Sequence, residues 1–279
     1  MNTTQNCWLN VTPWKKNLYE NRGLPDNYTD SSFLRELKKN IKPNNVTVRG
    51  AITLGASICI QLNIVILFGM VFTWLNNKWT TPNIIFMSST VLTVAGYICY
   101  IIKLPDRHDR ISKDLRTALI FLTFGYILSP VLKTLTETVS TDTIYTMTIF
   151  MFLIHLIFSK YGSPQVSLSD SLSITSSIFG SLMLASRLTS SMHAFSLLTV
   201  AVQCFVLLPF LLSRTENKIL ISLTLTLSTL YLLILISPII SIAFMIVTIF
   251  FHISCPLWYI RWQKYKDNIY GPWDEAVIT

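Results

Sequence analysis

Five ionisable side chains interrupt the apolar runs in the middle of this chain. The polar segment KTLTETVSTDT carries Lys133, Glu137 and Asp142, and His155 and Arg187 lie in or at the end of later apolar runs. Carboxylates and an imidazole are the groups of general acid–base catalysis, so an intramembrane enzyme that uses Glu137, Asp142 and His155 is one interpretation. Ionisable groups at membrane depth are costly and by default indicate a functional site.

The same side chains can also satisfy one another. Lys133 and Glu137 are one helical turn apart and could pair. Arg187 could extend its charge towards the interface, or pair with Glu137 or Asp142. A histidine within a span, such as His155, more often bonds across helices than catalyses. A polar pocket for a lipid headgroup or a partner loop, and a self-satisfied polar plug, both stay open as interpretations.

Little room is left for the polar segment at 133–143. The apolar runs on either side of it, 117–132 and 144–159, hold sixteen residues each. Crossing a bilayer core takes about 20 residues. Part of the polar segment should therefore help to span the membrane or lie in its interface.

No familiar catalytic or metal-binding motif accompanies these residues. The sequence has no DxD metal site, no two glutamates eight positions apart, and no GxGxxG, Walker, HExxH or GxSxG pattern. Its five cysteines are scattered without the spacing of metal ligands. The sequence therefore predicts no catalytic residue, metal or cofactor in this chain.

Membrane-spanning helices must position these residues. Hydrophobic residues make up 51% of the 279-residue chain and charged residues only 13%, against about 25% in soluble domains. This composition predicts an all-α, polytopic helical membrane protein with about eight transmembrane helices. If the last break, at Ser237-Pro238, is only a kink, the count is seven. We expect the spans near 51–75, 82–102, 115–134, 142–159, 168–186, 193–213, 218–237 and 239–260.

Basic residues lie almost entirely on one side of these spans. With eight spans, 19 of the 22 Lys and Arg residues fall on the side that holds both ends of the chain. This asymmetry predicts a cytoplasmic N-terminal segment (1–50), a bundle (51–260) and a cytoplasmic tail (261–279). The net charge of +8 does not indicate binding to nucleic acid, because basic residues next to the spans contact anionic lipid headgroups. N-glycosylation sequons begin at Asn2, Asn10, Asn27 and Asn45. They could be glycosylated only if the N-terminal segment lay on the lumenal side, which is the opposite orientation.

Two basic surface features suit contacts with lipid. Residues 29–42 can form a short amphipathic helix with lysines beside its apolar face, which would lie on the cytoplasmic leaflet or pack on a partner subunit. The loop after the second expected span is also basic and could attract an anionic headgroup. Its basic residues are Lys103, Arg107, Arg110 and Lys113.

A ladder of small side chains runs along the fifth expected span. Ser169, Ser173, Ser177, Ser181 and Ala185 recur every four residues and therefore share one face of a helix. Small faces let helices approach closely in lipid. This face predicts a helix–helix seam, either within the chain or with a partner.

Several long, irregular motifs resemble one known family. They are Pro13-Trp14-Lys15-Lys16, SPVLKTLTETVSTDTIY at 129–145, LASRL at 184–188, His193-Ala194-Phe195 and Gly271-Pro272-Trp273-Asp274-Glu275. In this order they resemble the PIG-C family, the C subunit of phosphatidylinositol N-acetylglucosaminyltransferase. The likeness runs from about residue 13 to residue 278.

The resemblance implies membership of a complex in the endoplasmic reticulum membrane. In that family the complex transfers N-acetylglucosamine from UDP-GlcNAc to phosphatidylinositol on the cytoplasmic face, the first step of glycosylphosphatidylinositol anchor synthesis. The catalytic fold belongs to a PIG-A-like subunit, so no catalytic residue carries over to this chain. We therefore expect a non-catalytic scaffold that holds the catalytic subunit, meets other small membrane subunits and presents phosphatidylinositol. The alternative is a small transporter or lipid scramblase.

Overall fold

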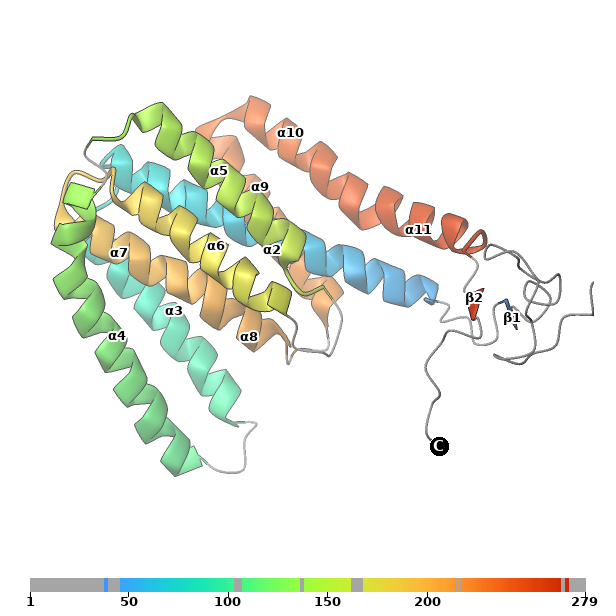
Figure 1. The fold of residues 1–279 in the computed structure, drawn as a ribbon, viewed down its shortest axis with the longest axis horizontal. Helices are drawn as coiled ribbons and strands as arrows, with labels where there is room; N and C mark the ends of the chain where they lie inside the picture. Colours follow the sequence, from blue (N-terminus) through green and yellow to red (C-terminus); the bar gives the residue numbers. More distant parts are fainter. Residues whose placement is uncertain are drawn as a thin grey trace, which may run out of the picture. The chain divides into compact units, whose positions relative to one another are not determined.

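The chain folds into a bundle of long helices (Figure 1). The computed structural model describes residues 38–39, 46–102, 107–135, 138–161, 168–213, 215, 217–266 and 269–270. Short π-helical segments, η1 (Gln203–Leu207) and η2 (Phe250–Ser254), join α7 to α8 and α10 to α11. The helices are α2 (Val48–Asn76), α3 (Pro82–Ile102), α4 (Arg107–Leu135), α5 (Thr141–Phe158), α6 (Leu168–Ala185), α7 (Ser191–Val202), α8 (Leu208–Ser213), α9 (Lys218–Ile236), α10 (Pro238–Ile249) and α11 (Cys255–Gln263).

Each expected span coincides with one of these helices or with a π-joined pair, which confirms the all-α, polytopic prediction. Seven helical stretches of the described chain are long and apolar enough to cross a membrane. The remaining one, α6, is rich in serine and is not among them. It nevertheless runs antiparallel to α5 along its whole length. His155 near the end of α5 bonds Ser173 near the start of α6, and Arg187 after α6 bonds Val139 before α5.

Capping side chains and a proline mark where helices start. Thr47, Ser140 and Ser190 each accept a hydrogen bond from a backbone N–H of the first turn that follows. Pro238 occupies the first turn of α10, after an extended Ser237 (φ −156°, ψ 121°). The chain therefore breaks at Ser237-Pro238 rather than kinking.

Helices α9 and α10 form an antiparallel hairpin after this break. Leu233 and Phe244, which lie near the turn, belong to one buried cluster. Further from the turn, Ser222 of α9 bonds His252 of η2. The two pairings are nearly symmetrical about Ser237-Pro238, as a hairpin requires, so the last two expected spans are separate.

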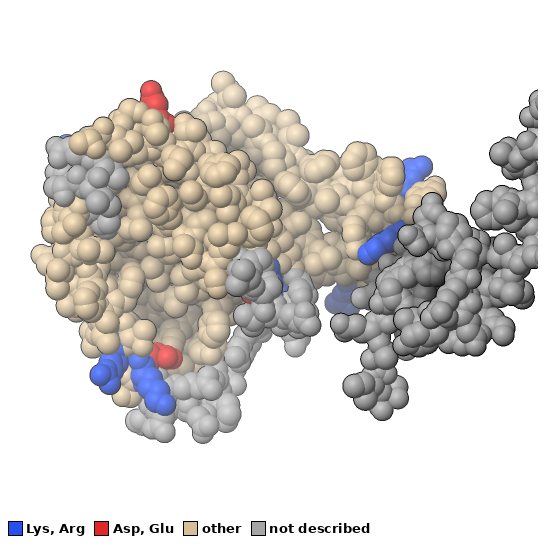
Figure 2. Space-filling model, viewed as in Figure 1, with Lys and Arg blue, Asp and Glu red and all other residues tan. Residues whose placement is uncertain are grey.

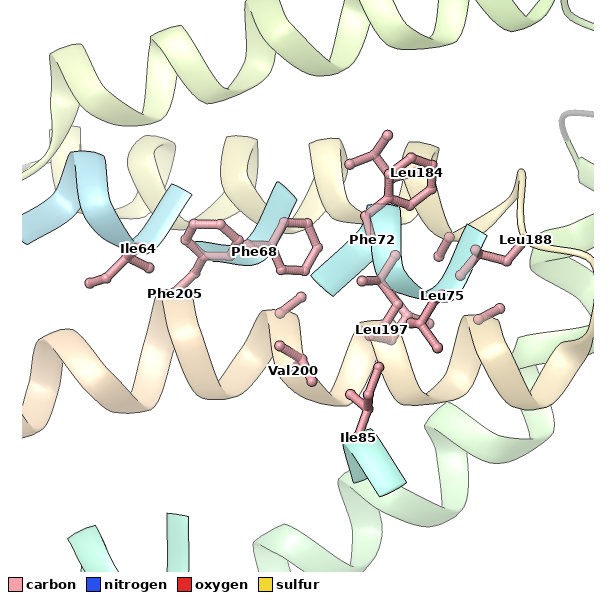
Figure 3. Close-up of a cluster of buried hydrophobic side chains, with 14 of the residues drawn as sticks. Ile64, Phe68, Phe72, Leu75, Ile85, Leu184, Leu188, Leu197, Val200 and Phe205 are labelled. Atoms are coloured by element: carbon pink, nitrogen blue, oxygen red, sulfur yellow. The ribbon is translucent and has the colours of Figure 1, made fainter. Parts of the chain in front are cut away.

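The apolar core lies where α2 meets α7 and η1 (Figure 3). Phe68 of α2 is fully buried and meets the ring of Phe205 edge-on, with centroids 5.2 Å apart. It also meets Phe152 of α5 at 5.8 Å. Every residue of Ala194–Ala201 in α7 is buried, so this helix is surrounded on all sides. Because lipid tails are as apolar as these side chains, close packing rather than escape from water holds the helices together.

Two short strands join the two terminal segments. Lys38–Lys39 (β1) pairs antiparallel with Ile269–Tyr270 (β2), Lys38 opposite Tyr270. At these two lysines the helix expected over 29–42 is wrong, because extended pairing replaces it; its other residues lie outside the described part of the chain. Contacts divide the chain into a unit of terminal segments, 1–46 with 261–279, and the bundle, 47–260.

Candidate functional site

The α5–α6 hairpin gathers most of the residues that the sequence singled out. In Figure 1 the two helices lie side by side. His155 and Ser173 meet at one end of the hairpin, and Asp142 and Arg187 lie at the other. Asp142 and His155 are thirteen residues apart on one helix, which separates them by about 20 Å. They cannot act together on one substrate atom, so this geometry does not favour an enzyme that uses Asp142 and His155 in one proton transfer.

His155 joins α5 to α6 by a hydrogen bond. Its side chain is only 2% exposed. Nδ1 lies 2.9 Å from the Ser173 carbonyl oxygen and 2.9 Å from Ser173 Oγ. The Ser173 hydroxyl in turn donates to the His155 carbonyl at 3.1 Å. Because a carbonyl only accepts, Nδ1 carries a proton and donates it across the seam, which is the bonding role rather than the catalytic one.

The other edge of the His155 ring packs instead of bonding. Nε2 is buried and has no hydrogen-bond partner in the described chain. The ring stands edge-on to Phe205, with centroids 5.1 Å apart at 77°. Phe205 belongs to η1, and π-helical insertions are frequent at functional sites. Here the insertion places the Phe205 ring against the His155 side chain.

Hydroxyl groups donate hydrogen bonds to the carbonyl groups at the C-terminal end of α5. Ser159 Oγ donates to the His155 carbonyl at 2.6 Å, and the Tyr161 hydroxyl donates to the Leu156 carbonyl. Burial raises the pKa of the Tyr161 phenol to about 12, so it stays a donor at physiological pH. Lys160 and Asp170 form an ion pair of 3.4 Å beside this end. These bonds satisfy carbonyls that a helix end leaves open.

The small-residue ladder is buried within the helix bundle of this chain. Ser173, Ser177, Ser181 and Ala185 are at most 4% exposed, and Ser169 belongs to α6 without a described side chain. The Ser177 and Ser181 hydroxyls donate to carbonyls of their own helix, at 2.8 and 2.7 Å. The hydroxyls therefore need no partner across the seam, and α6 presents a small, satisfied surface to its neighbours.

The polar segment after α4 lies between two helices. α4 continues through Lys133, whose side chain is not described, and Glu137 is outside the described residues. Arg187 Nη2 donates to the Val139 carbonyl at 2.5 Å. Asp142 lies in the first turn of α5 and forms no ion pair with a described residue, so its proposed pairing with Arg187 is wrong. Arg187 thus contacts the backbone just before α5 rather than Asp142.

The basic loop between α3 and α4 is only partly described. Lys103 lies outside the described residues, and Arg107 and Arg110 begin α4 without described side chains. Lys113 is exposed, as is Arg116 one turn further on, which the sequence argument did not single out. Figure 2 shows Lys and Arg gathered near helix ends, with a broad uncharged surface along the helices.

A second buried polar cluster, missed from the sequence, joins α2, α9 and η2. His252 Nε2 lies 2.9 Å from Ser222 Oγ, and its Nδ1 lies 2.9 Å from the Thr248 carbonyl and 3.0 Å from Cys59 Sγ. Asn63, fully buried, donates to the Cys59 carbonyl at 2.7 Å. These residues are far apart in sequence and share no motif spacing, so no sequence signal could have grouped them.

The described residues offer little space or metal chemistry. No group of three or more His, Cys, Asp and Glu side chains among them could hold a metal ion. A cavity of about 110 Å³ lies between α4 and the start of α7, lined by Tyr126, Ser129, Pro130 and Ser191. Small-molecule sites usually measure about 300–1,000 Å³. This geometry suits helix packing better than the binding of a sugar nucleotide.

Comparison with known proteins adds what geometry alone does not give. Residues 14–274 match the sequence model of a family described as phosphatidylinositol N-acetylglucosaminyltransferase. The chain is 38% identical to the C subunit of phosphatidylinositol N-acetylglucosaminyltransferase from Bos taurus, covering 95% of this chain and 93% of the bovine protein. It is 37% identical to the putative C subunit of the same transferase from Dictyostelium discoideum, over 95% and 79% of the two chains. No solved structure matches the chain.

Proposed function

We propose, because the chain belongs to the PIG-C family of phosphatidylinositol N-acetylglucosaminyltransferase, that it is a membrane subunit of the complex that makes N-acetylglucosaminyl-phosphatidylinositol. That complex transfers N-acetylglucosamine from UDP-GlcNAc to phosphatidylinositol, which begins glycosylphosphatidylinositol anchor synthesis. The observation that carries the proposal is the likeness to proteins named as the C subunit of this transferase, which extends over 95% of the chain. The complex would reside in the endoplasmic reticulum membrane, with both ends of this chain cytoplasmic.

The chain's own part is scaffolding rather than chemistry. Two of its ionisable groups are engaged in helix contacts: the buried His155 with Ser173, and the partly exposed Arg187 with Val139. The cavity between α4 and the start of α7, about 110 Å³, is too small for a nucleotide sugar. These features support assigning the reaction to a partner, a PIG-A-like catalytic subunit, with other small membrane subunits alongside.

A second part of the proposal concerns the lipid acceptor. Lys113 is exposed near the start of α4, which also contains Arg107 and Arg110, and Lys103 precedes this helix in the sequence. Basic side chains near the membrane surface attract anionic headgroups. This end of the α3–α4 pair would therefore hold the phosphatidylinositol headgroup near the catalytic subunit.

A transporter or lipid scramblase fits the same contacts less well. A polar path needs unsatisfied polar groups around a water-filled space. Instead, the buried hydroxyls of α6, such as Ser177 and Ser181, are bonded within their own helix. Lipid flipping by the purified chain alone in liposomes is the result that would favour this alternative.

Affinity purification in mild detergent tests the proposal. The chain should co-purify with a glycosyltransferase subunit, and the complex should transfer GlcNAc from UDP-GlcNAc to phosphatidylinositol, whereas the chain alone should not. Asp142→Asn should leave this activity unchanged in assembled complex. A chain that purifies without a glycosyltransferase, or that is active alone and loses activity on Asp142→Asn, contradicts the proposal.

Lys113→Glu tests the lipid part separately. In assembled complex it should raise the KM for phosphatidylinositol and leave the KM for UDP-GlcNAc unchanged. Lys264→Glu, a charge reversal at an exposed lysine outside that loop, serves as the control. Unchanged lipid KM in the Lys113 variant would remove the headgroup role and leave the scaffold role standing.

A further inference from the structure

The first half of α4 is exposed on every side. Leu119, Ile120 and Phe121 are consecutive and are 56%, 49% and 37% exposed. Consecutive helix residues point in directions about 100° apart, so at this height no neighbouring helix covers any side of α4. The opposite case is Ala194–Ala201 of α7, where every residue is buried.

The preceding helix, α3, is equally bare. Only 6% of its apolar window is buried, the same share as in α4, against 44% in α2 and in the α7–α8 span. Val91 and Leu92, adjacent in sequence, are 68% and 75% exposed. Both helices lean on Phe195 of α7, through Phe86 at 5.5 Å and Tyr126 at 5.7 Å.

Helices α3 and α4 hardly touch each other within the described chain. The Tyr97 hydroxyl donates to Asp114 Oδ2 at 2.9 Å, near the loop that joins the two helices. Beyond this bond, most apolar side chains of α3 and of the first half of α4 stay exposed. A span at the edge of a bundle normally packs one face on its neighbours and turns the other to lipid, but the first half of α4 lacks even the packed face.

Charge distinguishes a protein occupant from lipid tails. Arg116 is exposed and lies near the start of the candidate span Ile111–Val131, one turn after Lys113. It forms no ion pair with a described residue, and the nearby Asp114 is already bonded to Tyr97. Ionisable residues within membrane spans usually pair with one another. An apolar helix with one carboxylate at this height would supply both the missing packing and the missing charge.

We propose that α3 and the first half of α4 form the docking surface for a membrane-spanning helix of another subunit of the transferase complex. The docked helix is apolar and places an acidic side chain opposite Arg116. This assignment rests on the proposed function, because it takes its partner from the same complex. It identifies one surface of the chain, out of several lipid-exposed ones, as a subunit interface.

Photo-crosslinking in the intact complex tests the assignment. A benzoylphenylalanine at Leu119 should form a covalent adduct with one membrane subunit, and the same group at Leu92 should capture that same subunit. The matched control is Leu235 of α9, which is 67% exposed and should capture lipid only. Adducts of Leu119 with lipid alone, or with a second copy of this chain, would overturn the docking surface.

Leu119→Trp and Leu235→Trp give a second, independent measurement. Neither side chain is covered by the bundle, so both variants should unfold at the wild-type temperature when the chain is purified alone. The Leu119 variant should recover about ten-fold less of the crosslinked subunit, the scale of one hot-spot contact. The Leu235 variant should recover the wild-type amount. Equal recovery from both variants contradicts the proposal.

The two proposals fail in different ways. If the purified complex transfers GlcNAc to phosphatidylinositol but Leu119 captures only lipid, the docking surface is wrong and the proposed function stands. If no glycosyltransferase co-purifies with the wild-type chain, the proposed function itself fails, and the docking proposal fails with it. Arg116→Gln should lower recovery of the crosslinked subunit, and wild-type recovery would contradict the charge pairing.

Discussion

Substitution of Gly55 by alanine should destabilise the bundle, because α2 and η2 approach closely at this residue. A Cβ atom at position 55 would lie 2.6 Å from the Phe251 carbonyl oxygen and 3.0 Å from Pro256 Cγ. Ordinary contact begins at 3.4 Å, and the nearer atom belongs to the backbone, which cannot rotate away. Overpacking of this kind costs about 1–3 kcal/mol. The gain in helix propensity from Gly to Ala, up to about 1 kcal/mol, offsets only part of it.

Gly69, further along α2, is the matched control. A Cβ atom there meets nothing within 4 Å. Gly69→Ala should therefore keep only the propensity gain and stabilise by up to about 1 kcal/mol. Both variants change one hydrogen into one methyl group in the same helix, so the difference between them reports the contact with η2.

Unfolding of the purified chain in detergent micelles, followed by circular dichroism, measures both effects. The Gly55 variant should unfold at a lower temperature than wild type, and the Gly69 variant at the same or a higher one. If Gly55→Ala is as stable as Gly69→Ala, the close approach of α2 to η2 is wrong. The packing of α10 and α11 against α2 would then depend on other contacts.

Three further substitutions test the buried seams by the same unfolding measurement. Ser177→Leu should destabilise by about 1–3 kcal/mol through overpacking, whereas the same change at exposed Thr175 should be nearly neutral; equal effects would contradict the seam. His252→Ala should cost about 1–3 kcal/mol, because it leaves buried partners unsatisfied, and a neutral result would remove the cluster around it. Asp170→Asn should cost less than about 1 kcal/mol, since its ion pair with Lys160 is partly exposed; a larger loss would mean that the pair is shielded from solvent.

The helices could be predicted from the sequence because each apolar run is bounded by a recognisable break. Ser237-Pro238 is the exception, because the sequence left a kink open there; the extended Ser237 before the proline ends the hydrogen bonds of α9. The serine ladder also gave a correct periodicity, because the register of a straight helix follows from residue number alone. The pattern left open whether the ladder packs within the chain or on a partner. The ladder residues are buried within the bundle of this chain.

The contacts of the histidines could not be predicted in the same way. His155 bonds Ser173, eighteen residues away, and His252 meets Cys59, nearly two hundred residues away. Both depend on which helices become neighbours, and on the π-helical insertions η1 and η2, which change the direction of side chains without a sequence signature. The contact of Arg187 with the Val139 carbonyl could not be predicted for a related reason, since the position of that carbonyl depends on how α5 and α6 pack.

The length of the helices explains why a polar segment is tolerated between α4 and α5. α4 begins at Arg107, well ahead of the apolar run 117–132 that the sequence suggested, and continues to Leu135. α5 begins at Thr141 and has 18 residues, about 27 Å, which matches a thin bilayer core. Only the first residues of α5 draw on the polar segment. At the opposite end of α4, Arg116 lies near the start of the candidate span, as it does in the span expected near 115–134. The end of α4, to Leu135, and the start of α5, from Thr141, thus share the polar segment 133–143, so each helix reaches its length by including part of it.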